Sequence, residues 1–277
     1  MIYILLGMGR QENVAIFDDT MTLCSKDEDL KQSISKSTAN QLLILEDDTL
    51  PKLKPAYKEN ADIIVSEKRT FEAAESYALS GKKVCVLNFA SASNPGGGVL
   101  NGAVAQEECL CRCSTLYFGL TKRELYTGFY LPHRRAQNYL YNNDIIYTPD
   151  VTVFKTDTIE PQLMDKKDWY NVNVITCAAP NLRFIPTGRI TNEEIYTIQL
   201  ERFSRILSVA AAQGNEVVIL GAFGCGAFMN PVHTVAEAAK NSVREFLKYF
   251  ETIEFAIYCR EDEKINYITF RDTLSQL

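Results

Sequence analysis

Short apolar runs rich in β-branched residues alternate with longer amphipathic stretches along this chain. Apolar runs of about four to eight residues are typical of buried strands, and apolar positions recurring every three or four residues are typical of helices. Several runs are apolar on both faces, as strands inside a mostly parallel or mixed sheet must be. The pattern therefore predicts an α/β protein with strands at residues 61–66, 84–89, 151–154, 172–177, 217–220 and 255–259.

The amphipathic stretches predict helices at residues 70–79, 106–117, 192–213 and 232–250. Thr191 and Glu194 have the spacing of a capping box, and Gly214 stands where a left-handed C-terminal cap is expected. Asn230 followed by Pro231 predicts an N-cap with proline in the first turn. The last of these helices carries an apolar stripe that we assign to the core, made of Val232, Val235, Ala236, Ala239, Val243, Phe246 and Phe250.

The first 60 residues are predicted to form an N-terminal extension packed on the sheet, and residues 61–277 the main domain. The alternative is a domain boundary near residue 60. Residues 30–45 have the pattern of a helix, and the acidic, proline-containing stretch that follows predicts a surface connection. Residues 1–8 are apolar but lack a basic segment and are too short to span a bilayer. We therefore expect neither a signal peptide nor a membrane partner.

The amino-acid composition and net charge limit the kinds of molecule that the protein is expected to bind. Hydrophobic residues at 46% and charged residues at 23% are ordinary for a globular protein. The net charge of −6 argues against strong general binding to nucleic acid, which needs a basic face. Arg134 and Arg135 beside His133 form one local basic candidate, for which a solvated loop is the alternative.

Eight cysteines lie in apolar segments, which predicts reduced, buried thiols in a cytoplasmic protein. Cys109, Cys111 and Cys113 have C-x-C-x-C spacing instead of the usual C-x2-C of a metal site, and the chain has only two histidines. On a helix only Cys109 and Cys113 share a face. Core packing is therefore favoured over a metal site, and we expect no metal and no cofactor.

Glycine-rich segments directly follow two of the predicted strands, one at residues 88–98 and one at residues 221–228. Ligands of open α/β sheets bind at the carboxyl ends of the strands, and loop amides before a helix bind anions. The second segment has the order G-x-x-G-x-G, which is neither a dinucleotide-binding fingerprint nor a Walker loop. Two such loops at equivalent strand ends favour a phosphate-containing ligand over the alternative of tight turns without a ligand.

Two adjacent acids, Glu107 and Glu108, stand at the start of the predicted helix. They are candidates for acid–base chemistry, although acids are also favoured in a first helical turn by about 0.3–1 kcal/mol each. Neighbouring helical side chains point about 100° apart, so only one of the two is aimed at a given bond. This disfavours the glycosidases whose acids flank the bond at about 5–10 Å from each other.

Residues 94–98 (NPGGG), 106–108 (QEE) and 110–117 (LCRCSTLY) together resemble the bacterial-type poly(ADP-ribose) glycohydrolases, a branch of the macrodomain superfamily. Residues 221–231 (GAFGCGAFMNP) resemble the diphosphate loop of that family, and residues 147–154 (YTPDVTVF) its intervening strand region. The resemblance covers about residues 84–260. It implies a macrodomain, with a mixed, largely parallel sheet of six or seven strands sandwiched between helices.

The resemblance also implies residue roles. Glu108 would protonate the departing oxygen and then activate water, and Glu107 would orient the ligand through hydroxyls of the distal ribose. Residues 224–227 would wrap the diphosphate, Phe228 would pack near the distal ribose or the adenine, and either Asn88 or Asn94 would contact ribose hydroxyls. The full set of ligand-binding residues implied is Asn88, Asn94, Gly96, Gly97, Gly98, Gln106, Gly224, Cys225, Gly226, Ala227 and Phe228.

The activity implied is hydrolysis of the ribose–ribose O-glycosidic bond of poly(ADP-ribose), which releases ADP-ribose. Two alternatives are a mono-ADP-ribosyl hydrolase acting on protein or nucleic acid, and an ADP-ribose-binding macrodomain without turnover. The partners expected are ADP-ribose or ADP-ribosylated macromolecules, bound by a monomer. The family's N-terminal region, which often closes over the adenine side, is matched only loosely here by residues 15–20.

Overall fold

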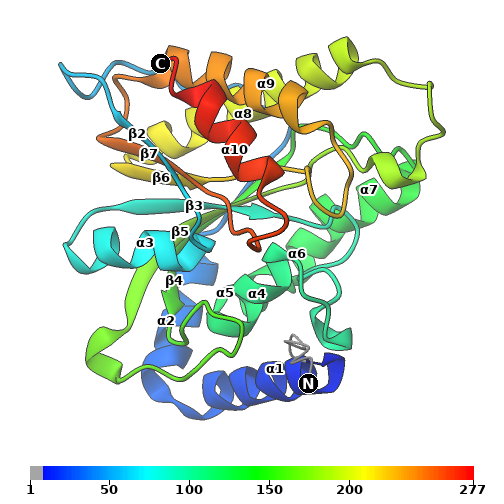
Figure 1. The fold of residues 1–277 in the computed structure, drawn as a ribbon. Coiled ribbons are helices and arrows are strands. Elements are labelled where there is room, and N and C mark those ends of the chain that lie inside the picture. Colours follow the sequence, from blue (N-terminus) through cyan, green and yellow to red (C-terminus); the bar gives the residue numbers. More distant parts are fainter. Residues whose placement is uncertain (1–8) are drawn as a thin grey trace, which may run out of the picture.

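The computed structural model of the chain describes residues 9–277. Its centre is a seven-stranded sheet with the order β1-β4-β5-β3-β6-β7-β2 (Figure 1). The expected fold class, a mixed and largely parallel sheet between helices, is confirmed. The strands are β1 (Leu42–Ile44), β2 (Asp62–Ser66), β3 (Val84–Phe89), β4 (Ile145–Val153), β5 (Tyr170–Cys177), β6 (Val217–Leu220) and β7 (Thr252–Ala256).

Five of the strands are parallel, and this fixes where a ligand site can form. β3 pairs in parallel with β5 and β6, and β7 pairs in parallel with β6 and β2. β1 and β4 are added antiparallel beside β5. The carboxyl ends of the parallel strands meet at one edge of the sheet, so the segments that follow β2, β3, β6 and β7 converge there.

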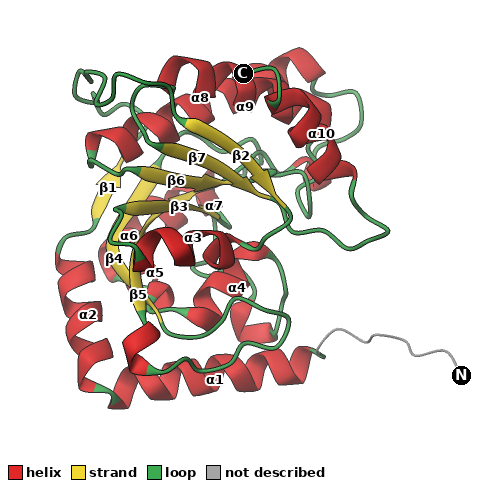
Figure 2. Cartoon of the chain, turned by 60° about the vertical axis from the view of Figure 1, so that its left-hand side comes forward, coloured by secondary structure: helices red, strands yellow, loops and turns green. Residues whose placement is uncertain are grey.

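Helices cover both faces of the sheet, as Figure 2 shows. α8, α9 and α10 pack on one face around a core that includes Phe203, Phe223 and Phe255. α3, α4 and α5 pack on the other face, with α1 outside α4. The longer helices are α1 (Arg10–Lys26), α2 (Glu28–Ala39), α3 (Thr70–Leu79), α4 (Gln106–Cys113), α8 (Asn192–Ala212), α9 (Val232–Phe246) and α10 (Ile265–Leu274).

The short helical segments lie mostly between α4 and β4. They are the 3-10 turn η1 (Val99–Asn101), α5 (Leu116–Leu120), α6 (Arg123–Leu125), the π-helix η2 (Tyr126–Tyr130) and α7 (Leu131–Ala136). The two further 3-10 turns are η3 (Lys166–Asp168) and η4 (Leu182–Phe184).

The elements with the plainest local signals are confirmed. The strands at 84–89 and 217–220 and the helix at 70–79 have the predicted bounds. At the start of α8 the hydroxyl of Thr191 accepts from the N–H of Glu194 at 3.2 Å, and the Glu194 carboxylate accepts from the N–H of Thr191 at 2.8 Å. Gly214 has the left-handed conformation expected of a cap, with φ of 67°.

The predicted ends of two helices were wrong, because a polar side chain near each end forms hydrogen bonds with backbone groups. The helix predicted to reach residue 117 ends at Cys113, since the hydroxyl of Ser114 donates to the carbonyl of Leu110 and accepts from the N–H of Leu116. Asn230 is not the N-cap of α9, a position taken by Pro231.

The last predicted strand and helix were displaced along the chain. α9 ends at Phe246 instead of residue 250, and β7 runs from Thr252 to Ala256 instead of residues 255–259. The sequence pattern did not indicate this strand, because it contains Glu254, a charged residue type that is seldom buried. Glu254 is buried here, and its carboxylate accepts hydrogen bonds from Ser66 and Tyr77. Residues 145–148 belong to β4, whose bulge at Thr148 to Val151 hid its continuity.

The N-terminal region departs most from expectation. Residues 30–45 are not one helix, because α2 ends at Ala39 and residues 42–44 form edge strand β1. One strand of the sheet, β1, thus belongs to the predicted N-terminal extension. The boundary of that extension near residue 60 stays a prediction. The expectation about a signal peptide falls on residues 1–8, outside the described residues. From residue 9 onward, the chain has no helix whose length and hydropathy would let it span a membrane.

All eight cysteines are free thiols. Burial is confirmed for Cys24, Cys85, Cys111, Cys113 and Cys177. It is wrong for Cys109, Cys225 and Cys259, which are partly exposed.

Candidate active site

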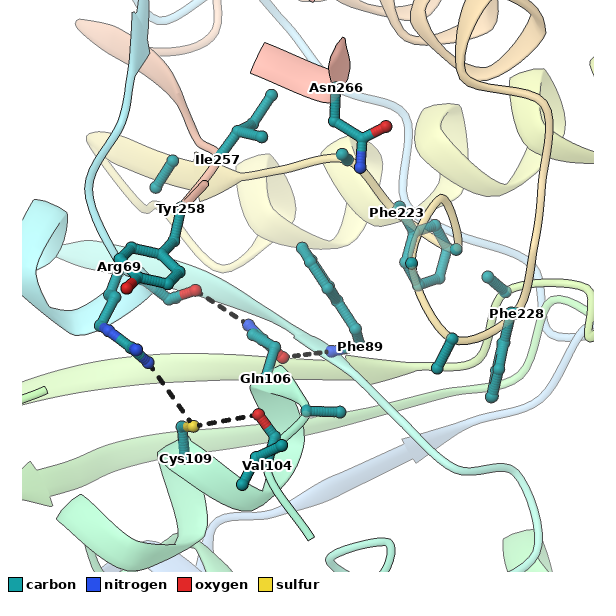
Figure 3. A pocket seen from close by; sticks show the side chains of 18 of the residues that line it. Arg69, Phe89, Val104, Gln106, Cys109, Phe223, Phe228, Ile257, Tyr258 and Asn266 are labelled. Atoms are coloured by element: carbon teal, nitrogen blue, oxygen red, sulfur yellow. Dashed lines mark hydrogen bonds between the residues drawn. The ribbon is translucent and has the colours of Figure 1, made fainter. Parts of the chain in front are cut away.

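A first cavity of about 310 Å³ lies at the carboxyl edge of the parallel strands (Figure 3). The segments after β2, β3, β6 and β7 contribute to it, together with the start of α4 and with Asn266 of α10. Its lining includes Arg69, Thr70, Phe89, Gln106, Cys109, Asp157, Phe223, Phe228, Ile257, Tyr258 and Asn266.

Flat side chains dominate the wall of the first cavity. The guanidinium of Arg69 lies 4.0 Å from the ring centroid of Tyr258, and Phe89, Phe223 and Phe228 add apolar surface (Figure 3). Cations and rings stacked in this way suit a planar aromatic ligand. The first cavity is therefore shaped for a nucleobase more than for a sugar.

Asp157 is a buried carboxyl group that lines the first cavity. One carboxylate oxygen accepts from the N–H of Phe71 at 3.0 Å, and the other has no hydrogen-bond partner within residues 9–277. Arg69 is 3.9 Å from that second oxygen. Burial raises the pKa of the Asp157 carboxyl. The second oxygen therefore keeps its capacity to accept a hydrogen bond at the wall of the first cavity.

Gln106 joins the first turn of α4 to the end of β3. Its side-chain oxygen accepts from the N–H of Phe89 at 2.8 Å, and its amide nitrogen donates to the carbonyl of Leu87 at 2.7 Å and to Thr70 at 3.0 Å. Both ends of the amide are thus used to fix the helix on the strand. The predicted contact of Gln106 with a ligand therefore stays a prediction.

Glu107 is held beneath the first glycine loop, with 2% of its surface exposed. Its carboxylate accepts from the N–H of Ser91 at 2.7 Å and from the amide of Asn88 at 3.3 Å. Its pKa is raised to about 8, mainly because burial disfavours the charged form and in part because Glu108 adds negative charge. The Ser91 N–H opposes this shift.

Glu108 points from the same helix turn at the triple glycine. One oxygen accepts from the N–H of Gly98 at 2.7 Å, while the other is buried without a hydrogen-bond partner among the described residues. At Gly97, where φ is 59°, a Cβ would lie 2.4 Å from the bonded oxygen. Glycine is therefore required here for the acid to reach the loop, as well as for the backbone conformation.

The second glycine loop is fixed from below by Asn230. This buried side chain donates to the carbonyls of Pro180 at 2.7 Å, Gly224 at 3.1 Å and Phe228 at 3.3 Å, and it accepts from Gln199 at 3.0 Å. The N–H groups of residues 224 and 226–228 make no hydrogen bond within the described part of the chain. A row of unpaired amides on a fixed loop is a site for an anion.

A second cavity of about 550 Å³ opens beside Glu108. It has no lining residue in common with the first cavity. It is lined by Ser91, Asn94, Pro95, Gly97, Gly98, Leu100, Asn101, Glu108 and Tyr117.

The remaining predicted site residues lie in three different places. Asn94 is exposed at the rim of the second cavity, where its side-chain oxygen accepts from Arg134 at 2.8 Å. Asn88 is buried under Glu107, so the two asparagines left open by the sequence have different surroundings. His133 does not belong to a basic patch, because it is buried and bonded to Phe129 and Asn142.

Arg69, Asp157, Tyr258 and Asn266 were missed by the sequence reasoning. The rule that pointed to the segments after β3 and β6 applies equally to Arg69 after β2 and to Tyr258 after β7. No comparable signal marks Asp157 or Asn266, which reach the first cavity only through the packing of distant segments.

This fold and site define an α/β protein that binds a nucleotide-like ligand at the carboxyl edge of its sheet, beside a buried pair of acids. A family model described as the catalytic domain of microbial-type PARG matches residues 10–156. The chain belongs to this family.

Solved structures of bacterial proteins are similar over most of the chain. The poly(ADP-ribose) glycohydrolase of Thermomonospora curvata is 29% identical, with a TM-score of 0.84, over 95% of this chain and 100% of that one. Its complex with the inhibitor ADP-HPD has a TM-score of 0.80, at 29% identity over 95% and 99% of the two chains. The enzyme of Deinococcus radiodurans in complex with ADP-ribose has a TM-score of 0.75, at 31% identity over 88% and 98%. The comparison with curated proteins gave no match.

Proposed function

We propose that this protein hydrolyses the ribose–ribose O-glycosidic bond of poly(ADP-ribose) and releases ADP-ribose. Membership of the microbial-type PARG family and likeness to solved glycohydrolases support this activity. The single observation that carries it is the state of Glu108, a buried acid with one oxygen fixed by the Gly98 N–H and the other unpartnered beside a cavity.

The two ends of ADP-ribose match two parts of the site. The adenine lies in the first cavity, against the rings of Tyr258 and the phenylalanines. The diphosphate lies on the second glycine loop, where the unpaired N–H groups of residues 226–228 meet its charge. The distal ribose then reaches the acids, and Glu107 orients it through its hydroxyls.

The reaction needs one proton donor and one water. Glu108 gives its proton to the departing oxygen as the bond from that oxygen to the ribose C1″ breaks. The ribosyl centre gains oxocarbenium character, which the carboxylate left on Glu108 and the nearby diphosphate stabilise. Water then adds to C1″ and returns its proton to Glu108. The products are free ADP-ribose and a polymer shorter by one unit.

Release of ADP-ribose from radiolabelled poly(ADP-ribose) tests this proposal, with a mono-ADP-ribosylated protein run beside it. We expect rapid release from the polymer. Intact polymer with a cleaved mono-ADP-ribosyl protein would replace the lead function by the mono-ADP-ribosyl alternative. Tight ADP-ribose binding with neither substrate cleaved would leave a binding module, and calorimetry without any ADP-ribose binding would remove all three. A cytoplasmic monomer remains the expectation for location and assembly.

A further inference from the structure

We infer that the second cavity is a binding subsite for the adenosine unit that carries the departing oxygen. The protein then holds nucleotides on both sides of the bond that it cleaves. This inference rests on the proposed function and concerns the part of the polymer that lies outside the released ADP-ribose.

The two cavities lie on different sides of α4. Gln106 and Cys109 line the first cavity, and their spacing of three places them on one face of the helix. Glu108 lines the second cavity and points about 100° away from Cys109. Adenosine in the first cavity and diphosphate on the second loop bring the ribose C1″ to Glu108. The group beyond the departing oxygen therefore continues into the second cavity.

The second cavity is large enough for a nucleoside. At about 550 Å³ it falls within the size of ligand pockets, and one ribose ring fills a small part of it. In poly(ADP-ribose) the departing oxygen is the 2′-oxygen of an adenosine, so a nucleoside follows directly. A mono-ADP-ribosyl linkage would place an amino-acid side chain or a nucleic acid there instead.

The wall of the second cavity has surfaces for a base. Tyr117 is half-buried and braced by an edge contact with Phe17 of α1 at 4.9 Å. Gly96 makes room for it, since a Cβ there would lie 2.7 Å from the Tyr117 ring. Leu100, with 62% of its surface exposed, adds an apolar edge, and Asn101 adds an amide. Aromatic and amide groups side by side suit a stacked nucleobase.

Arg134 supplies positive charge at the rim of the second cavity. One of its nitrogens donates to the carbonyl of Ser93 at 2.6 Å and to Asn94 at 2.8 Å, and another donates to the hydroxyl of Tyr126 at 3.3 Å. These acceptors are neutral, and no carboxylate of residues 9–277 forms an ion pair with Arg134. The charge is therefore available to the diphosphate attached to the adenosine in the second cavity.

The test compares two substrates that differ only beyond the departing oxygen. One is an ADP-ribose dimer with the 1″–2′ linkage, and the other is an aryl glycoside of ADP-ribose. The readout is the ratio of kcat/KM for the dimer to kcat/KM for the glycoside. Asn101→Asp should lower this ratio about threefold and Asn101→Lys should raise it about threefold, because the dimer carries the extra diphosphate. Asn60→Asp and Asn60→Lys, in an exposed loop, are the matched controls.

Arg134→Gln should lower the same ratio about tenfold, whereas Arg244→Gln, exposed on α9, should leave it unchanged. Calorimetry with the Glu108→Gln protein repeats the comparison without turnover, and the dimer should bind more tightly than ADP-ribose. Ratios equal to wild type in every variant would overturn the inference, and so would a fall in both Asn101 variants. Failure of the proposed function is distinct, because the wild-type protein would then leave the dimer intact.

Discussion

The two glycine loops look alike in the sequence but are glycine-rich for different reasons. In the first loop the carboxylate of Glu108 fills the space that a side chain at Gly97 would need, since it comes within 2.4 Å of where a Cβ would lie. In the second loop Gly224 makes room for Ala179 and Asn230, and nothing lies within 4 Å of a Cβ placed at Gly226. The first loop is built around a carboxylate of its own chain, and the second leaves its amides open.

The difference shows that the backbone N–H donors of the two loops serve different purposes, one holding a catalytic side chain and the others binding a ligand. The N–H of Gly98 is used by Glu108, so it fixes the acid instead of a ligand. The N–H groups of the second loop are unpaired among the described residues, and Asn230 holds the loop through its carbonyls instead. Substitutions that disturb the first loop should therefore affect turnover, and substitutions that disturb the second loop should affect ligand binding.

The largest expected effect is that of Glu108→Gln. The amide keeps the shape of the side chain but is neither a proton donor of the required acidity nor a base, so kcat for polymer should fall at least about a thousandfold. Chromatography of released ADP-ribose measures this loss. Calorimetry should show ADP-ribose binding within a few-fold of wild type. If turnover survives the change, the proton donor has been misassigned.

Gly97→Ala and Gly226→Ala compare the two loops directly. Alanine at residue 97 must displace Glu108 and adopt a φ of 59°, which should cost about 1–3 kcal/mol of stability and lower kcat at least about a hundredfold. Alanine at residue 226 should change stability by less than about 0.5 kcal/mol. Thermal unfolding and steady-state rates measure both. Equal stability losses in the two variants would contradict the proposed difference between the loops.

Asn230→Ala tests the support of the second loop. The change removes the side-chain hydrogen bonds to three carbonyls and to Gln199, so ADP-ribose affinity should fall about tenfold, with a stability loss of about 1–3 kcal/mol. Calorimetry measures the affinity, and saturating polymer should restore most of kcat. Asn60→Ala serves as a surface control. An effect on kcat alone would show that the second loop takes part in the chemical step.

A last expected effect, on stability and not on turnover, is a dependence of stability on pH through Glu107. Its pKa rises from an ordinary 4.5 to about 8 on folding, so the folded protein binds more protons than the unfolded chain between these values. The contribution of Glu107 to stability therefore decreases as pH rises from 4.5 to 8, by a few kcal/mol at most.

Thermal unfolding of wild type and Glu107→Gln across this range measures the effect. The variant cannot titrate at this position, so its Tm relative to wild type should increase between pH 5 and pH 8.5, by several degrees at about 2–4 °C per kcal/mol. A constant difference between the two proteins would show that the Glu107 pKa is not raised in the folded state.

The sequence predicted the parts of the fold and site whose signals are local. Strand β3 with the glycines after it, strand β6 with its own loop, and the acids at the start of α4 are each contained in a short stretch of consecutive residues. A glycine run between a buried strand and a helix is informative on its own, because backbone conformation there depends on few distant contacts. The same holds for the capping box of α8.

The elements that the sequence missed have polar residues at buried positions. On the inner face of α1, Phe17 and Cys24 alternate with Asn13 and Thr20, whose side chains bond to the backbone at Gly102 and Arg112. Those bonds exist only once the segments are folded together, so no apolar stripe marks the helix. Edge strand β1 was missed for another reason: it is three residues long and apolar throughout, so it shows no alternation that would distinguish it from a helix end.

The sequence by itself determined that two glycine loops and a pair of acids lie at the carboxyl edge of a parallel sheet. Only the tertiary structure decided how they differ. It placed Glu107 and Glu108 in separate surroundings, one beneath the loop and one beside the second cavity, and it brought Arg69, Asp157 and Tyr258 to a common pocket. The reason is physical: burial and hydrogen-bond partners are set by segments remote in the chain, and no local pattern specifies them.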